Sequence, residues 1–183
     1  MDTDSSSEIC RLRCYRRDDV DAIPAQANDL DVARYMSRNF PHPYTRSDAE
    51  AWLDIVLGQH VPINFAIEVD GAVAGGIGFF LFNDERFGTA DVGYWLGRAF
   101  WGRGIATYAL KTIVRYGFLD LELRRIQSRV MAANVASARV LEHAGFTLEG
   151  TQRAYCVDRE GTEQDALLYG LLSASSRSQP QSG

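Results

Sequence analysis

The stretch "YWLGRAFWGRGIATYALK", Tyr94–Lys111, joins a strand-like apolar run to a helix-like pattern through a loop with three glycines. Gly102 and Gly104 flank Arg103 in this loop, and the expected helix follows at once. The first turn of a helix has N–H groups without intrahelical partners and the positive end of the helix dipole. A loop without bulky side chains lets an anion approach them, so the stretch predicts a phosphate or pyrophosphate site. Alone, so short a glycine loop is equally consistent with a plain strand-to-helix turn.

Two common phosphate-binding motifs are excluded by the residues of this loop. A P-loop ends in Gly-Lys-Ser or Gly-Lys-Thr, and the sequence contains neither. The dinucleotide-binding fingerprint G-x-G-x-x-G needs a third glycine at the position of Thr107. That fingerprint also follows the first strand of its domain, whereas this loop comes after roughly the fourth expected strand. A dinucleotide-binding oxidoreductase is therefore disfavoured.

Composition and charge limit the classes of protein further. The 183 residues, 46% hydrophobic and 23% charged, suit one soluble domain that needs no disulfide or metal to fold. A net charge of −5 disfavours nucleic-acid binding, which needs a basic surface. No apolar run could span a membrane, and the N-terminus lacks the features of a signal peptide, so a cytoplasmic protein is expected. Cys10, Cys14 and Cys156 are expected to be thiols, and three scattered histidines do not support a zinc site.

Hydrophobic periodicity predicts one mixed α/β sheet with helices on both faces. The Asp70-Gly71 pair between two apolar runs predicts a β-hairpin. Residues 1–8 and 173–183 are expected to be flexible, which leaves one domain at 9–172. Strands are expected at 9–15, on both sides of 70–71, and at 89–96, 124–132, 146–157 and 163–172, and helices from 18 onward and at 31–38, 47–58, 104–118 and 134–146.

Two helices carry boundary signals. A capping box at Ser47–Glu50 predicts the start of a helix that places Trp52, Ile55 and Val56 on one face. Gly145 predicts the end of a short amphipathic helix in which His143 is expected to be structural.

Three stretches in a fixed order carry a resemblance to a known family. "DVGYWLGRAFWGRGIAT" at 91–107, "ANVASARVLEHAGFTLEG" at 133–150 and "DALLYGLL" at 165–172 resemble the GCN5-related N-acetyltransferase (GNAT) superfamily. Within it, the sequence is most similar to the ribosomal-protein N-terminal acetyltransferase branch, the RimJ/RimL type. The resemblance covers roughly 9–172 and is most specific at 91–150. It implies a single-domain fold with a mixed, mostly antiparallel, twisted sheet and a splayed strand pair at the acetyl-CoA site.

The resemblance implies acetyl-CoA as a co-substrate. The family's Q/R-x-x-G-x-G/A loop, whose backbone amides meet the CoA pyrophosphate, matches residues 101–106, with Trp101 in the place of Gln or Arg. Without the resemblance, Arg103 is a solvated loop arginine and Asn134 a simple helix cap. The implied cofactor-binding residues are Trp95, Leu96, Trp101, Gly102, Arg103, Gly104, Ile105, Ala106, Thr107, Asn134 and Ser137.

Acetyl transfer to an amine needs a deprotonated amine, a stabilised oxyanion and a proton donor for the leaving thiolate. Many members of the superfamily use a tyrosine as the donor, but Leu141 occupies that position here. By resemblance, Ser137 is expected to lie near the thioester sulfur as the donor. Asp91 matches a catalytic glutamate of histone acetyltransferases and is expected to be the base. Without the resemblance, Ser137 is a first-turn residue that bonds backbone, and Asp91 is a surface carboxylate.

The leading prediction is direct acetyl transfer to a primary amine, with a protein N-terminus as one candidate acceptor. A small amine is the alternative, because relatives with similar cofactor motifs act on aminoglycosides, polyamines or amino acids. The acceptor is expected to be chosen by the N-terminal helices and the loop "NFPHPYT" at 39–45, which carry no readable motif. A non-catalytic acyl-CoA-binding domain is less favoured, because Ser137 and Asp91 are both present. Many relatives form dimers, so a homodimer is an expectation of the resemblance alone.

Overall fold

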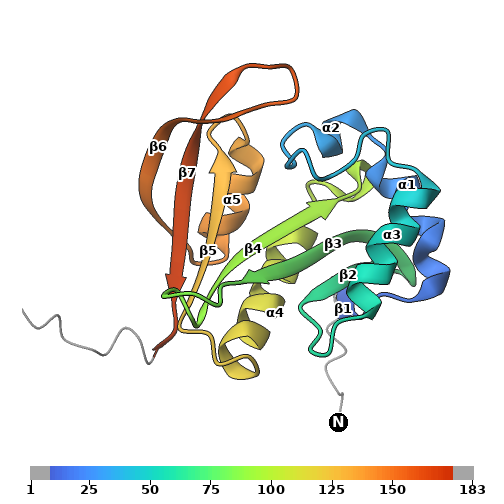
Figure 1. Ribbon diagram of the computed structural model, residues 1–183, viewed down its shortest axis with the longest axis horizontal. Coiled ribbons are helices and arrows are strands. Elements are labelled where there is room, and N and C mark those ends of the chain that lie inside the picture. Colours follow the sequence, from blue (N-terminus) through green and yellow to red (C-terminus); the bar gives the residue numbers. More distant parts are fainter. Residues whose placement is uncertain (1–8, 175–183) are drawn as a thin grey trace, which may run out of the picture.

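One seven-stranded sheet organises the chain, of which the computed structural model describes residues 9–174 (Figure 1). The strands lie in the order β1-β2-β3-β4-β5-β7-β6, in which β4 and β5 run parallel and all other neighbours are antiparallel. The predicted mixed, mostly antiparallel sheet is confirmed. The strands are β1 Arg11–Arg13, β2 Asn64–Val69, β3 Ala72–Leu81, β4 Thr89–Leu96, β5 Arg125–Met131, β6 Thr147–Val157 and β7 Glu163–Leu172.

Helices cover both faces of the sheet and form two separate cores (Figure 1). On one face, α4 and α5 bury Leu110, Ile113 and Leu141 against the strands. On the other face, α1 and α3 bury Ile23 and Leu53. The helices are η1 Arg17–Val20, α1 Ala22–Ala27, α2 Leu30–Ala33, α3 Arg46–Leu57, η2 Arg98–Phe100, α4 Ile105–Leu119 and α5 Val135–His143. None of the helices within residues 9–174 is long and apolar enough to cross a bilayer.

Strand β4 connects the two cores, because successive side chains of a strand point to opposite faces. Val92 and Leu96 are buried in the core beneath α4, and Tyr94 packs against the same core. Trp95 packs against the core beneath α1 and α3. Tyr94 and Trp95 therefore face opposite sides of the sheet, next to each other in the chain.

The two parallel strands separate after a short pairing. β4 and β5 pair only where Thr89–Asp91 lies beside Arg125–Gln127, and β4 then continues to Leu96 (Figure 1). The predicted splayed strand pair is confirmed. Beyond the point of separation, the end of β4 is open toward α5, which is where a ligand can enter the sheet.

Two helix predictions differ from the structure. The helix expected at 31–38 is only Leu30–Ala33, because the chain continues in turns in which the Met36 N–H donates to Ala33 and the Phe40 N–H to Ser37. The same two carbonyl groups also accept from the Arg159 side chain. The capping box lies at Thr45 and Asp48, two residues before the predicted position. The hydroxyl of Thr45 accepts from the Asp48 N–H and the Asp48 carboxylate accepts from the Thr45 N–H, so the helix begins at Arg46.

The buried face of α3 also differs from the predicted one. Ala49, Leu53 and Val56 are buried, with a spacing of about one helical turn, whereas Ile55 is 61% exposed. The flexibility predicted for 1–8 and most of 173–183 lies outside the described residues.

A nearly buried arginine ties β1 to the segment that enters α1. The Arg13 guanidinium donates two hydrogen bonds of 2.8 Å to the two carboxylate oxygens of Asp19, and it also contacts Glu68. The Arg16 N–H donates to Asp19 at 2.7 Å. Burial alone would raise the pKa of the Asp19 carboxyl, but these hydrogen bonds outweigh it and hold the pKa below its ordinary value.

We expect Asp19→Asn to lower the free energy of unfolding by about 2 kcal/mol at neutral pH, because it leaves Arg13 with one carboxylate. A depressed folded-state pKa stabilises the fold above the unfolded pKa and loses that effect as the pH falls through the folded value. The difference from the wild type should therefore shrink below about pH 4. Urea unfolding at several pH values measures it. The control is Asp54→Asn, which removes an exposed pair with Arg17 and should cost less than about 0.5 kcal/mol. An equal loss in both variants would contradict the prediction.

Candidate active site

The glycine loop between β4 and α4 holds its last two glycines in a left-handed conformation. Gly102 has a φ of 71° and Gly104 a φ of 74°, and a Cβ on either would meet no atom within 4 Å. Gly104 is the N-cap of α4, and no described side chain caps this end of the helix. The space beside the loop is therefore open, and the first N–H groups of α4 have no side-chain partner. A negatively charged group can approach these N–H groups directly.

A cavity of about 730 Å³ opens onto this loop. The end of β4, the loop, the first turn of α4 and one face of α5 form its walls, and the chain around α2 closes another side. The structure brings together in this cavity all eleven residues that the sequence predicted to bind the cofactor, which are Trp95, Leu96, Trp101, Gly102, Arg103, Gly104, Ile105, Ala106, Thr107, Asn134 and Ser137.

Arg34 and Arg139, to which the sequence assigned no role, also line this cavity, and so does His143, which was expected to be structural. Arg139 and His143 lie four residues apart on α5, so their shared helix face could have been found from spacing. Arg34 lies just past α2 in irregular chain, where no periodic pattern marks it. Together with Arg103 and the open end of α4, Arg34 and Arg139 give the cavity the positive character that a pyrophosphate and a further phosphate need. The residues present therefore fit a CoA ester.

The side chain of Trp101 fixes the loop to the strand before it. Its indole Nε1 donates to the carbonyl oxygen of Leu96 at 2.7 Å, while 46% of the residue stays exposed. Trp101, which stands where the family pattern has Gln or Arg, thus anchors the loop to β4.

Two hydroxyl groups meet where β4 passes the start of α5. The Tyr94 Oη lies 2.8 Å from the Ser137 Oγ. The Asn134 side chain accepts from the Ser137 backbone N–H at 3.1 Å, so Asn134 is the N-cap of α5. Burial raises the pKa of Tyr94 to about 12, so its hydroxyl keeps its proton at neutral pH. The pair can therefore deliver a hydrogen bond or a proton into the cavity.

Asp91 lies elsewhere. It precedes Tyr94 by about 10 Å of extended strand and points to the other face of the sheet. Its carboxylate accepts a hydrogen bond of 2.8 Å from Gln127 and forms an ion pair of 3.2 Å with Arg129. Asp91 is not among the described residues that line this cavity or the second cavity described below. The structure thus places Ser137 in the cavity and the predicted base outside it.

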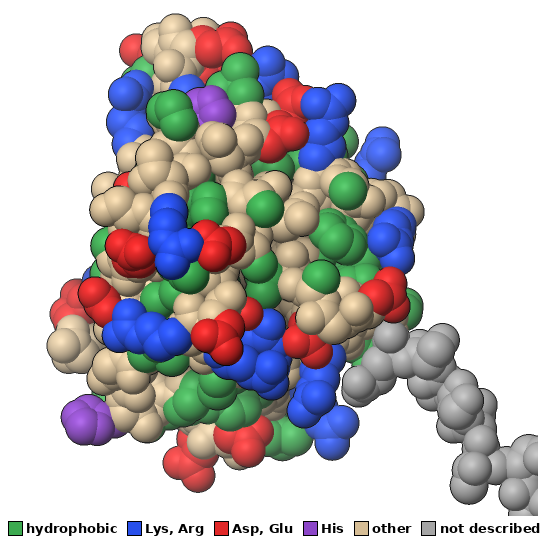
Figure 2. All heavy atoms as spheres, turned by 90° about the vertical axis from the view of Figure 1, so that its right-hand side faces the viewer, with side chains coloured by type: hydrophobic (Ala, Val, Ile, Leu, Met, Phe, Trp, Pro, Cys, Tyr) green, Lys and Arg blue, Asp and Glu red, His purple; other side chains and the backbone are tan. Residues whose placement is uncertain are grey.

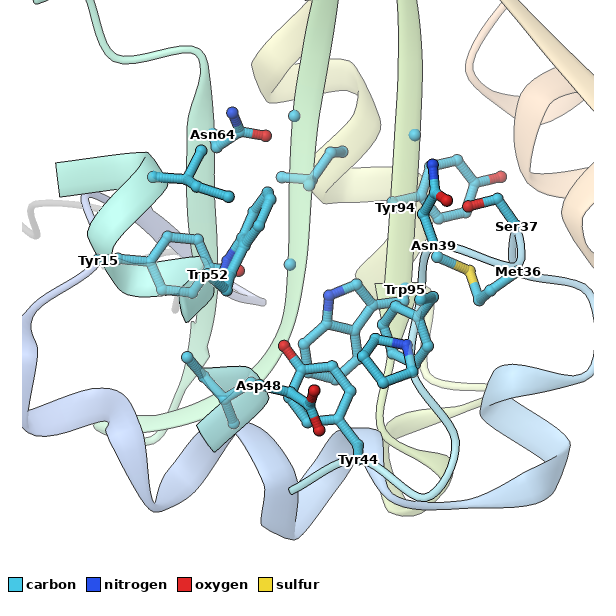
Figure 3. A pocket seen from close by; sticks show the side chains of 18 of the residues that line it. Tyr15, Met36, Ser37, Asn39, Tyr44, Asp48, Trp52, Asn64, Tyr94 and Trp95 are labelled. Carbon is cyan, nitrogen blue, oxygen red and sulfur yellow. The ribbon is translucent and has the colours of Figure 1, made fainter. Parts of the chain in front are cut away.

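A second cavity, of about 400 Å³, lies on the opposite face of β4, between the sheet, α3 and the chain that precedes α3 (Figure 3). The two cavities meet at Tyr94, Trp95 and Met36, which line both. A group bound in the second cavity therefore lies next to the part of a ligand that extends from the first cavity to the end of β4. Its aromatic lining consists of Tyr15, Phe40, Tyr44, Trp52, Tyr94 and Trp95.

Glycines form the floor of the second cavity. A Cβ on Gly76 would lie 2.3 Å from the Tyr15 hydroxyl and 2.7 Å from the Trp95 Nε1. A Cβ on Gly78 would lie 2.0 Å from the Asn64 Oδ1. Neutral polar atoms therefore lie over bare backbone between the aromatic rings, an arrangement that suits an apolar group with a few hydrogen-bonding atoms.

Two other predictions concern cysteine and metal. Burial raises the pKa of the Cys156 thiol, which donates weakly to the Gln164 carbonyl at 3.7 Å, so Cys156 is not poised as a nucleophile. Within residues 9–174, no group of His, Cys, Asp and Glu side chains could hold a metal ion.

The sequence is similar to those of known proteins. The sequence profile of the acetyltransferase (GNAT) domain matches residues 10–147. The uncharacterized N-acetyltransferase p20 of Bacillus licheniformis is 31% identical over 172 residues, which cover 91% of this chain and 94% of the relative. The spermidine N(1)-acetyltransferase of Escherichia coli K12 is 27% identical over 149 residues, covering 79% and 76% of the two chains.

A solved structure is similar over almost the whole fold. RimJ of Mycobacterium smegmatis, in complex with CoA-disulfide, has a TM-score of 0.79 and 25% identity, covering 92% of this chain and 83% of that one. The profile match covers the strands and helices that form the glycine loop and the first cavity. The chain therefore belongs to the GNAT family, whose members are acetyl-CoA-dependent N-acetyltransferases.

Proposed function

We propose that the acceptor of this N-acetyltransferase is a primary amine on an uncharged, largely apolar group, such as the first residue of a protein chain. The observation that carries the proposal is the second, aromatic cavity of about 400 Å³, called the acceptor cavity below. It meets the first cavity, called the cofactor cavity, at Tyr94, Trp95 and Met36. Aromatic rings bind apolar side chains over large contact areas, and Trp95 and Tyr15 supply polar atoms for a peptide carbonyl.

Charge in this cavity disfavours a polycation. Asp48 is the single carboxylate among the described residues that line it, and Asp48 already accepts hydrogen bonds of 2.8 and 2.6 Å from the N–H and hydroxyl of Thr45. Figure 2 shows acidic and basic side chains interspersed on the side of α1 and α3, with no acidic patch gathered there. Polyamines and aminoglycosides carry several ammonium groups, and each buried charge needs a partner.

Two observations support the RimJ/RimL-type branch. Asn134 caps α5 and Ser137 follows in its first turn, which is the arrangement that the resemblance implies. The similarity to RimJ of M. smegmatis extends over 92% of the chain.

We propose the following sequence of bond changes. The amine loses one proton to water and its nitrogen attacks the thioester carbonyl carbon at the junction of the two cavities. The carbon–sulfur bond then breaks, and the thiolate takes a proton from the Ser137 hydroxyl. The Tyr94 hydroxyl, 2.8 Å away, returns a proton to Ser137, and the second proton released by the nitrogen restores Tyr94 through solvent. The position of Asp91 gives no support to a direct role as base, so none is assigned.

The test measures CoA thiol release from acetyl-CoA with two acceptor panels. One panel contains short peptides with free Ala, Ser, Thr and Met N-termini, and the other contains spermidine, an aminoglycoside and free amino acids. We expect kcat/KM for the best peptide to exceed that for spermidine by about 100-fold, because a second ammonium finds no unpaired carboxylate in the cavity. N-acetylated peptides are the control for background thiol release. Faster turnover of spermidine than of any peptide would overturn the proposed acceptor and leave the acetyltransferase assignment intact.

A further inference from the structure

One irregular segment forms walls of both cavities. The segment 34–45, called the strap below, joins α2 to α3 without regular structure. Its Met36 lines both cavities, and Figure 3 shows Met36, Ser37 and Asn39 beside Tyr94. The position of the strap therefore sets the shape of the acceptor cavity at its junction with the cofactor cavity. Its other lining residues are Phe40, Pro41 and Tyr44 in the acceptor cavity and Arg34 and Tyr35 in the cofactor cavity.

A single arginine from the far end of the chain binds this segment. The Arg159 guanidinium donates to the carbonyl oxygens of Ala33 at 2.8 Å and Ser37 at 3.1 Å, and also to that of Phe40. Backbone carbonyls in irregular chain need partners, and a planar guanidinium can serve several at fixed geometry. These three bonds span the part of the strap that borders both cavities.

Arg159 is held in place by the tight turn that carries it. The turn joins β6 to β7 and extends toward α2 (Figure 1). The Asp158 carboxylate accepts from the N–H groups of Glu160 at 3.0 Å and Thr162 at 2.9 Å, and from the Gln164 side chain at 2.9 Å. Gly161 has a φ of 88°, which glycine adopts without strain. The Arg38 side chain, which belongs to the strap, donates a hydrogen bond of 3.2 Å to the Asp158 carbonyl oxygen. The guanidinium therefore approaches the strap from a rigid support.

The remaining contacts hold mainly the ends of the strap. The Tyr44 N–H donates to the Asn28 side chain at 3.0 Å, and Thr45 is the N-cap of α3. The pair of Arg34 and Glu160, at 3.5 Å, is exposed on both sides and contributes little. In the middle of the strap, the Phe40 ring packs against Trp95. Arg159 supplies three hydrogen bonds from the turn between β6 and β7 to this part of the chain, and Arg38 makes another.

We propose that Arg159 is a positioning residue that holds the strap closed over the acceptor and so determines acceptor affinity. This inference rests on the proposed function only in taking the aromatic cavity as the acceptor site. Arg159 lines neither the acceptor cavity nor the cofactor cavity, so it can affect acceptor binding only by positioning the strap. Losing it should loosen the strap and weaken acceptor binding, while the glycine loop and α4 continue to hold acetyl-CoA.

The first test is hydrogen exchange of the full chain, read by mass spectrometry without any acceptor. We expect Arg159→Gln to speed exchange within 34–45 by about tenfold or more, because three charge-assisted hydrogen bonds are lost. Exchange in β4 and α4 should stay at the wild-type rate. Arg153→Gln is the matched control, since Arg153 is an exposed arginine on the same hairpin. If Arg159→Gln does not fold, Arg159→Lys takes its place, with a smaller increase expected. Wild-type exchange within 34–45 would overturn the proposal whatever the acceptor is.

The second test uses the best acceptor from the two panels. We expect Arg159→Gln to raise the acceptor KM by about tenfold with kcat lowered less, while the Kd for CoA, measured by calorimetry, changes less than about threefold. If Arg159 only stabilised the fold, Arg159→Gln would lower the melting temperature, and the acceptor KM would not change more than kcat. An unchanged acceptor KM in a variant with a loosened strap would overturn the positioning role. A failure of the peptide panel alone would count against the proposed acceptor and leave the exchange result standing.

Discussion

Gly104→Asp is expected to weaken acetyl-CoA binding by about 100-fold, or ~2.7 kcal/mol, because it places a negative charge beside the phosphates that the α4 N-terminus attracts. A Cβ at this position meets no atom of the protein within 4 Å, so the added side chain starts in the open space that the ligand needs. The measurement is the Kd for CoA by calorimetry, supported by the rise in melting temperature that saturating CoA produces. Because the readout is binding, it does not depend on the acceptor.

Two control variants separate charge from backbone strain. Gly104→Asn has nearly the same shape as Gly104→Asp and tolerates the left-handed conformation equally well, but it is neutral. It should weaken binding by about tenfold at most, since only bulk is added. Gly71→Asp adds the same side chain at a φ of 81° in the β2–β3 hairpin, far along the chain from the loop. It should leave CoA affinity unchanged. Equal losses for Gly104→Asp and Gly104→Asn would show that the phosphates do not lie at this end of α4.

The fold was predictable where a pattern repeats within a few residues. The strands expected at 89–96 and 163–172 have the observed bounds of β4 and β7, and the Asp70-Gly71 pair placed the hairpin between β2 and β3. The helix after the glycine loop begins one residue from its predicted start. In each of these cases the hydrogen bonds that stop or start the element are local, so nearby residue types carry the information.

One error occurs where a distant residue contacts the segment that was predicted to be helical. The predicted helix at 31–38 stops after Ala33 in turns whose carbonyl groups, Ala33 and Ser37, also accept from Arg159, more than a hundred residues away. No pattern within 31–38 could show this. The misplaced capping box is a different kind of error, because Thr45 and Asp48 have the same spacing as Ser47 and Glu50 and the sequence alone does not rank the two.

In the candidate site, the residues in continuous stretches of sequence were predictable, and the contacts that the sheet makes between distant residues were not. The glycine loop and the start of α5 are continuous stretches, so all eleven predicted cofactor residues line one cavity. The partner of Ser137 comes from β4, and only the sheet reveals that Tyr94 reaches it. Asp91 was assigned from a matching position in relatives, but its pairing with Arg129 depends on the register of β4 and β5, which the sequence does not specify.

Ser137→Ala is expected to lower kcat by about 100-fold, because the leaving thiolate loses its proton donor. The Ser137 side chain contacts Tyr94, whereas the cap of α5 uses the Ser137 backbone N–H, which alanine retains. The fold and the Kd for CoA should therefore stay close to those of the wild type. Single-turnover thiol release measures the chemical step apart from product release. A kcat within about threefold of the wild type would remove Ser137 from the mechanism.

Tyr94→Phe tests whether the two hydroxyl groups act as one unit. Alone it should lower kcat by about tenfold, since Ser137 keeps its hydroxyl but loses the partner that returns its proton. In the double variant, Tyr94→Phe should add little to Ser137→Ala, because the relay is already broken and the two losses are not additive. Losses that add in full would mean that Tyr94 acts without Ser137, for example by shaping the junction of the two cavities.

Because the pKa of Tyr94 is raised to about 12, the wild-type rate should show no fall from tyrosine ionisation between pH 7 and about 10. A decline in that range, absent from Tyr94→Phe, would show that Tyr94 ionises before the reaction starts and would contradict a relay that begins from the protonated hydroxyl.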